Sequence, residues 1–220
     1  MIASGARYRR LDLKKHKDFE NRGLYYAATA MESLLCRDRE VIVVGGGNSA
    51  GQASVFLSGV AKHVHHVIRG ASLEATMSQY LISRIERSPH ITLYTDAEIV
   101  ELEGETALEY VTWKNCKTGE SVRKLIPRVF VMIGAEPNSG WIYGTVKLDG
   151  KGFVLTSGSS GFEVTPYATS VPGIYAVGDV RSASVKRVAS AVGEGSVVIS
   201  DIHRYLAQNR IDFPERAKAN

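Results

Sequence analysis

Cysteine is scarce in this sequence: Cys36 and Cys116 are the only two in 220 residues, they lie far apart, and there is no Cys-x-x-Cys pair. Disulfide frameworks and zinc sites use cysteines at short, repeated spacings, so neither is expected and no metal site is predicted. Long apolar runs are also missing. No segment reaches the roughly 20 residues that a membrane-spanning helix needs, and the N-terminus lacks a basic and then apolar signal pattern. These absences predict a cytoplasmic protein without a membrane partner.

Charge of one sign is not in large excess, because the formal net charge is only +4. Basic residues gather near the N-terminus, at 7–10 and 14–17. No nucleic-acid motif accompanies them, and such clusters more often form a solvated face. Nucleic-acid binding is therefore the weakest of the functional alternatives, and no nucleic-acid partner is predicted.

The most informative segment that is present joins an apolar run to a glycine-rich turn. Val41–Val44 is predicted to form a strand, the turn Gly45-Gly46-Gly47 follows it, and the next residues open a helix. Gly45 permits a sharp turn, Gly47 lets backbone N–H groups approach phosphate oxygens, and Ala50 lets the helix pack near the strand. The helix N-terminus adds unpaired donors and a partial positive charge. The pattern predicts a dinucleotide pyrophosphate site at Gly45, Gly47, Asn48, Ser49 and Ala50. A glycine turn that packs strand on helix without any ligand is the alternative.

The rest of the chain alternates between strand and helix patterns and then changes. Short strands are predicted at 41–44, 64–69 and 91–94, with helices at 25–36, 49–61 and 77–86. Short alternating segments at 97–102, 108–113 and 121–126 predict an antiparallel meander inserted into the parallel sheet, which resumes at 129–133. A strand at 173–177 and a helix at 188–206 complete the expected α/β fold.

Four segments then share the order of a known family's landmarks. Ala3–Ala6 resembles a crossover strand usually written A-T-G-A, Gly45–Ala50 a glycine loop of an NADPH domain, Ile133–Asn138 an I-G-x-x-P-N segment, and Gly173–Asp179 a flavin-binding G-x-x-A-x-G-D signature. Over nearly its whole length the chain resembles the C-terminal two-thirds of low-molecular-weight thioredoxin reductases, which are pyridine nucleotide-disulfide oxidoreductases.

The resemblance implies a fold and a domain arrangement. Residues 8–136 would be a Rossmann-like three-layer NAD(P)H-binding domain, with a parallel sheet and an inserted antiparallel meander. Residues 1–7 would be a crossover remnant of an FAD-binding Rossmann-like domain, and 137–220 its C-terminal portion. The family's first glycine-rich motif, which grips the ADP half of FAD, would lie before residue 1. We therefore expect a fragment, or a missing half supplied by another chain, and a homodimer for the full-length form.

The resemblance also assigns site residues. Asp179, beside Gly178, would hydrogen-bond the ribityl chain of FAD, and the start of the last helix would lie at the isoalloxazine edge. Arg69, at the end of the second strand, would read the adenosine ribose, and a cation there suits the 2′-phosphate of NADPH, with NADH as the alternative. The implied cofactor-binding residues beyond the glycine loop are Arg69, Gly134, Gly178, Asp179, Arg187, Val188 and Ala189.

Two departures from the family limit what can be implied. The family's redox pair C-A-T-C falls on Ala27-Ala28-Thr29-Ala30, so both sulfurs are absent and no catalytic residue is assigned. Glu74 stands near a position where the family has an arginine, which weakens the case for NADPH.

The sequence thus predicts an FAD-dependent NAD(P)H oxidoreductase in which hydride passes from nicotinamide to flavin and then to an acceptor other than a resident dithiol, such as an electron-acceptor protein. The alternative is a non-catalytic NAD(P)-binding or regulatory module that lacks flavin.

Overall fold

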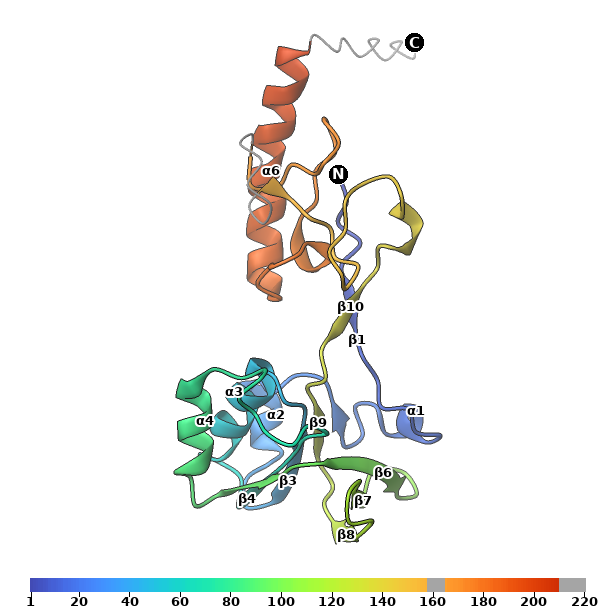
Figure 1. Cartoon of the computed structure of the whole chain (residues 1–220), viewed down its shortest axis with the longest axis vertical. Helices are drawn as coiled ribbons and strands as arrows, with labels where there is room; N and C mark the ends of the chain where they lie inside the picture. The colour runs from blue at the N-terminus through green and yellow to red at the C-terminus, as the bar shows by residue number, and fades with distance from the viewer. Residues whose placement is uncertain (158–164, 210–220) are drawn as a thin grey trace, which may run out of the picture. The chain divides into compact units, whose positions relative to one another are not determined.

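The computed structural model describes residues 1–157 and 165–209 of the chain and divides it into two units (Figure 1). Unit 2 is Tyr8–Gly134, and unit 1 combines Met1–Arg7 with the described residues from Ala135 onward. The boundary predicted after residue 136 lies just beyond this division. The parts of the predicted segment 137–220 at 158–164 and 210–220 lie outside the described residues.

A five-stranded parallel sheet forms the centre of unit 2, in the order β2-β9-β3-β4-β5. Its strands are short and rich in valine and isoleucine, as expected for a parallel sheet covered on both faces. Their bounds are Leu24–Tyr25 (β2), Val129–Val131 (β9), Glu40–Val44 (β3), His63–Val67 (β4) and Ile91–Tyr94 (β5).

The side chains of β3 alternate between two apolar clusters, which places a layer on each face of the sheet. Val41 and Val43 join the cluster that contains Ala50 and Leu57 of α3 (Asn48–Leu57). Ile42 and Val44 join a cluster with Trp113 of an antiparallel sheet. α4 (Gln79–Glu86) packs beside α3 (Figure 1). The three layers are therefore helices, parallel sheet and antiparallel sheet, which confirms the predicted fold class for this unit.

The predicted meander is also confirmed. It consists of β6 (Ala97–Glu103), β7 (Tyr110–Asn115) and β8 (Ser121–Leu125), all antiparallel, and β9 then returns to the parallel sheet. A short helix of one turn, α1 (His16–Phe19), comes before β2 in the chain.

The helix predicted over 25–36 is wrong at both ends. Leu24–Tyr25 forms strand β2 beside β9, where Leu24 is fully buried and Tyr25 stacks on Phe130. The helix α2 covers only Ala30–Leu34, because Thr29 caps its start through a capping box with Glu32. Burial against β9 therefore outweighs the helical spacing of these residues.

Unit 1 contains less regular structure. β1 (Ala6–Tyr8), where the chain passes into unit 2, pairs with β10 (Ala135–Pro137). Two 3₁₀ turns follow, η1 (Gly140–Ile142) and η2 (Gly178–Val180), and then the long helix α6 (Val188–Gln208). The regular strand predicted at 173–177 is not present. Among the described residues, Tyr175 forms an isolated bridge to Ala168 and Ala176 forms one to Ile2, and neither bridge extends into a ladder. Within the described parts of the chain, no helix is long and apolar enough to cross a membrane.

Candidate functional site

The glycine-rich turn follows β3 directly and opens helix α3, as predicted. Gly45 has φ +136°, and a Cβ there would collide with the carbonyl oxygen of Met132. Ala50 is fully buried against the sheet. Gly47 is the N-cap of α3 and has open space where a Cβ would point. No side chain caps the helix there, so its first N–H groups are available to an anion.

Groups from other elements fix this turn, and the residues that supply them, His66, Thr76 and Ser78, were not among the predicted site residues. His66 Nε2 donates to the carbonyl oxygen of Gly45 at 2.7 Å, and Thr76 Oγ1 donates to that of Gly46 at 2.7 Å. The backbone N–H of Ser78 donates to Asn48 Oδ1 at 2.8 Å, so the Nδ2 of Asn48 is the donor it can offer a phosphate. One signal in the sequence could have found His66: histidines between the valines of β4 (His63–Val67) are unusual for a buried parallel strand.

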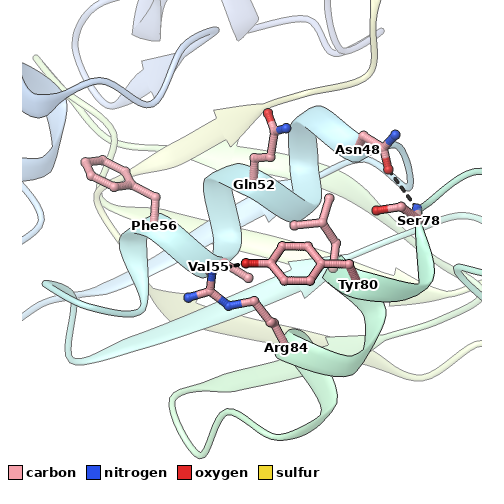
Figure 2. A pocket seen from close by; sticks show the side chains of 8 residues that line it. Asn48, Gln52, Val55, Phe56, Ser78, Tyr80 and Arg84 are labelled. Carbon is pink, nitrogen blue, oxygen red and sulfur yellow. Dashed lines mark hydrogen bonds between the residues drawn. The ribbon is translucent and has the colours of Figure 1, made fainter.

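A pocket of about 440 Å³ lies between α3 and α4, next to the turn (Figure 2). Arg84 donates to the hydroxyl of Tyr80 on one side of it, and Asn48 meets Ser78 at the end nearest the turn. Its lining residues are Asn48, Gln52, Val55, Phe56, Ser78, Tyr80, Leu81 and Arg84.

Arg69 lies two residues beyond the end of β4, and its side chain is exposed. Glu74 is exposed as well, and its pKa is lowered mainly by a hydrogen bond from Ser72. The carboxylate of Glu74 is thus held by its own loop.

The second glycine signature builds a different loop, in unit 1. Gly178 has φ +71° and is buried, and Asp179 follows it in η2. The Oδ1 atom of Asp179 is buried and has no hydrogen-bond partner among the described residues. A buried carboxylate oxygen without a donor is unfavourable unless a ligand satisfies it. A polyol hydroxyl, such as those of the ribityl chain of FAD, is the kind of donor that fits.

A largely buried ion pair holds this loop against α6. Glu194 accepts from the N–H of Gly178 at 2.6 Å and pairs with Arg181 at 2.7 Å. The side chains of the pair are only 13% and 12% exposed. Burial raises the pKa of Glu194, but Arg181 and the N–H of Gly178 outweigh it, so the net shift is downward. Sequence reasoning missed this pair.

The start of α6 presents the other predicted flavin contacts. Arg187 is its N-cap, Val188 and Ala189 are its first residues, and all three are exposed. No side chain caps this terminus, which leaves its N–H groups available.

Two of the four landmark segments are hydrogen-bonded to each other in unit 1. Asn138 donates its backbone N–H to Gly5 and its Nδ2 to the carbonyl of Ser4. Gly134, at the end of unit 2, has φ +96° and accepts from the N–H of Arg9. The crossover-like segment 3–6 and the segment 133–138 therefore meet, although they are far apart in sequence.

No dithiol is present where the family resemblance places one. Ala27 is half-buried, Ala30 is the first residue of α2, and neither carries sulfur. Cys36 and Cys116 are both free, and burial raises the pKa of the Cys36 thiol to about 11. Among the described residues, no group of three histidine, cysteine, aspartate or glutamate side chains is placed to hold a metal ion.

A glycine turn at the end of a covered parallel strand, together with a Gly-Asp loop in a second unit, defines an α/β protein built to bind dinucleotides. Residues 1–195 match the profile of the pyridine nucleotide-disulphide oxidoreductases, and the chain belongs to that family.

Individual relatives show which members of the family the chain resembles. The chain is 32% identical over 215 residues to the NADPH-dependent thioredoxin reductase 3 of Arabidopsis thaliana, covering 96% of this chain and 39% of that one. It is 29% identical over 209 residues to an NADH dehydrogenase of Bacillus subtilis, covering 95% and 39%. The solved thioredoxin reductase of Giardia duodenalis superposes with a TM-score of 0.78 at 28% identity, covering 94% and 65%. The resemblance to thioredoxin reductases is thereby confirmed, and the chain spans less than two-thirds of each of these relatives.

Proposed function

We propose that this chain is part of an FAD-dependent NAD(P)H oxidoreductase of thioredoxin reductase type that has no resident dithiol. Two features of the chain support the proposal: the uncapped glycine turn at α3, and the buried Oδ1 of Asp179, which has no hydrogen-bond partner in the described part of the chain. A protein that held only NAD(P) would have no use for the second feature.

Each residue has a definite part in this proposal. The turn Gly45–Gly47 and the first residues of α3 bind the pyrophosphate of NAD(P)H, and Arg69 reads the adenosine ribose, with NADPH preferred. Asp179 and Gly178 orient the flavin, and the positive end of α6 at Arg187, Val188 and Ala189 stabilises negative charge at its edge. FAD bound there supplies the two-electron chemistry that accepts hydride from the nicotinamide. Because positions 27 and 30 are alanines, the electrons leave to another acceptor, for which an electron-acceptor protein is the candidate.

The domain assignment forms part of the proposal. Residues 8–136 serve as the NAD(P)H domain, with Gly134 at its end, and 1–7 with 137–220 serve as part of the FAD domain. Exposed apolar side chains on α6 support a missing half, in the same or another chain, because such a face is normally covered. Val188, Val192 and Ile199 are exposed and share one side of the helix by their spacing. A homodimer for the full-length form and a cytoplasmic location complete the proposal.

A second candidate is a regulatory module that binds NAD(P) without flavin. The alanines at 27 and 30 favour it, since the reaction named for the thioredoxin reductases needs a dithiol route that this chain lacks. In that case no flavin would supply a donor to the buried Oδ1 of Asp179.

Flavin binding tests the proposal. The purified chain is titrated with FAD, and the quenching of flavin fluorescence gives a Kd for wild type, Asp179→Ala and the exposed control Asp12→Ala. Because the proposal places the grip on the ADP half of FAD outside this chain, we expect weak but measurable binding in wild type and Asp12→Ala, and its loss in Asp179→Ala. A wild type that binds NADPH by calorimetry but binds no FAD would favour the regulatory module. An unchanged FAD affinity in Asp179→Ala would show that the role given to Asp179 is wrong.

A further inference from the structure

The glycine turn has little stiffness of its own. Three consecutive glycines have wide backbone freedom, and the peptides between them rotate without a side-chain penalty. Tight binding of a phosphate needs the N–H groups fixed in one direction before the ligand arrives. The anchors of this turn must therefore come from elsewhere in the fold.

His66 is the first anchor, and its ring is fully buried in β4. A carbonyl oxygen can only accept, so the Nε2 that contacts Gly45 carries the proton. The Nδ1 of the neutral ring is then an acceptor, and it lies 3.1 Å from the hydroxyl of Ser54, which is also fully buried. Burial lowers the pKa of His66, which favours this neutral form. The ring thus connects the turn to α3 with both nitrogens satisfied.

Thr76 is the second anchor, from the segment ahead of α4. Its hydroxyl holds the Gly46 carbonyl, and two residues later Ser78 bonds Asn48 at the start of α3 (Figure 2). The short segment Thr76–Ser78 is therefore attached twice to the turn and the residue that follows it.

Holding these carbonyls determines where the N–H groups point. In a planar trans peptide the C=O and the following N–H point in opposite directions. The Gly45 carbonyl fixed by His66 directs the N–H of Gly46 the other way, and the Gly46 carbonyl fixed by Thr76 does the same for the N–H of Gly47. Two successive donors are thus oriented at the N-terminus of α3.

We propose that His66 and Thr76 are positioning residues that hold the glycine turn ready for the pyrophosphate of NAD(P)H. The inference rests on the proposed function, because that function supplies the ligand. It adds two residues that contact no ligand and act through the carbonyls of Gly45 and Gly46.

The test compares coenzyme affinity in matched variants of the full chain. Thr76→Val removes the hydroxyl at an exposed position with little change in shape, and Thr76→Ser restores it. His66→Leu removes both ring bonds. The control is Thr92→Val, which also removes an exposed threonine hydroxyl, but one that hydrogen-bonds the side chain of His63 away from the turn. Calorimetry gives the Kd for NADPH, NADH and ADP-ribose, which contains the pyrophosphate but no nicotinamide, and thermal melts without ligand report folding.

We expect Thr76→Val to raise the Kd for all three ligands by about fivefold, which is the effect of one hydrogen bond, and His66→Leu to raise it by more. Thr76→Ser and Thr92→Val should bind like wild type, and the melting temperature of Thr76→Val should match that of Thr92→Val. If Thr76→Val binds as tightly as wild type, or His66→Leu folds and does so, the inference is overturned while the proposed function stands. If wild type binds none of the three ligands, both are overturned. A His66→Leu variant that fails to fold leaves the decision to Thr76→Val and Thr76→Ser.

Discussion

Arg69 is the residue on which coenzyme choice depends in our proposal. It is exposed beyond the end of β4, and the competing carboxylate of Glu74 is held by Ser72. Because a hydrogen bond to a charged group contributes more than a neutral one, Arg69→Ala should weaken NADPH by about tenfold and leave NADH nearly unchanged. Titration of both coenzymes measures this, with Arg87→Ala as an exposed control. Equal weakening of NADPH and NADH would mean that Arg69 does not read the 2′-phosphate.

Single residues could be predicted from the sequence where their role is local. Gly45 follows β3 at a point where the chain must turn sharply, and the structure gives it φ +136°. His66 and Thr76 could not be assigned in this way. Their bonds reach back to residues 45 and 46 and exist only once β3, β4 and the start of α4 are side by side.

At the scale of elements, continuous apolar runs were the reliable signal. Such runs predicted β3 and β9, which are buried along most of their length, whereas β4 contains three histidines and β5 is a partly exposed strand at the edge of the sheet. The predictions failed where pairing with a segment distant in the sequence determined the local structure. Tyr25 was predicted to begin a helix but lies in β2 and pairs with β9, and residues 173–177 have the composition of a strand but meet only single bridging residues.

Helix α6 is tied to the Gly178–Asp179 loop by Glu194, and this gives an element-scale prediction. Glu194→Ala leaves Arg181 buried without its partner and the N–H of Gly178 without an acceptor. Breaking a nearly buried pair should lower the free energy of unfolding by about 2–4 kcal/mol. Denaturant unfolding followed by circular dichroism measures the change. The control, Glu86→Ala on the exposed side of α4, should change it by less than about 0.5 kcal/mol. If the two variants unfold alike, the pair does not hold the loop.

For the whole molecule, the two units differ in how complete their cores are. The sheet of unit 2 is covered on both faces, by α3 and α4 on one side and β6–β8 on the other. Unit 1 leaves apolar side chains of α6 exposed. Sequence patterns predicted unit 2 better than unit 1, because the layers of unit 2 consist of regular strands and helices with a simple alternation of apolar residues. The bridges and turns of unit 1 depend on contacts that no periodicity encodes.

The stability of unit 2 should fall in mild acid, because β4 carries three histidines whose charged forms the fold disfavours. Burial lowers the pKa of His63, His65 and His66, and for His65 it outweighs the opposing hydrogen bond to Glu40. The folded chain therefore binds fewer protons than the unfolded chain below about pH 6.5, and stability is lost as the pH falls through that value.

Glu40 acts in the same direction at lower pH. Its pKa is lowered chiefly by the hydrogen bond with His65 and further by Lys124, so its contribution is present above its ordinary pKa and is lost on further acidification. We expect the melting temperature to decrease steadily from pH 7.5 to 5.0 at constant ionic strength. His65→Phe, which keeps an aromatic ring against Trp113 and Tyr94, should show a smaller decrease over the same range. A wild-type melting temperature that stays level or rises toward pH 5 would contradict the argument. The fold would then not disfavour the charged forms of these histidines.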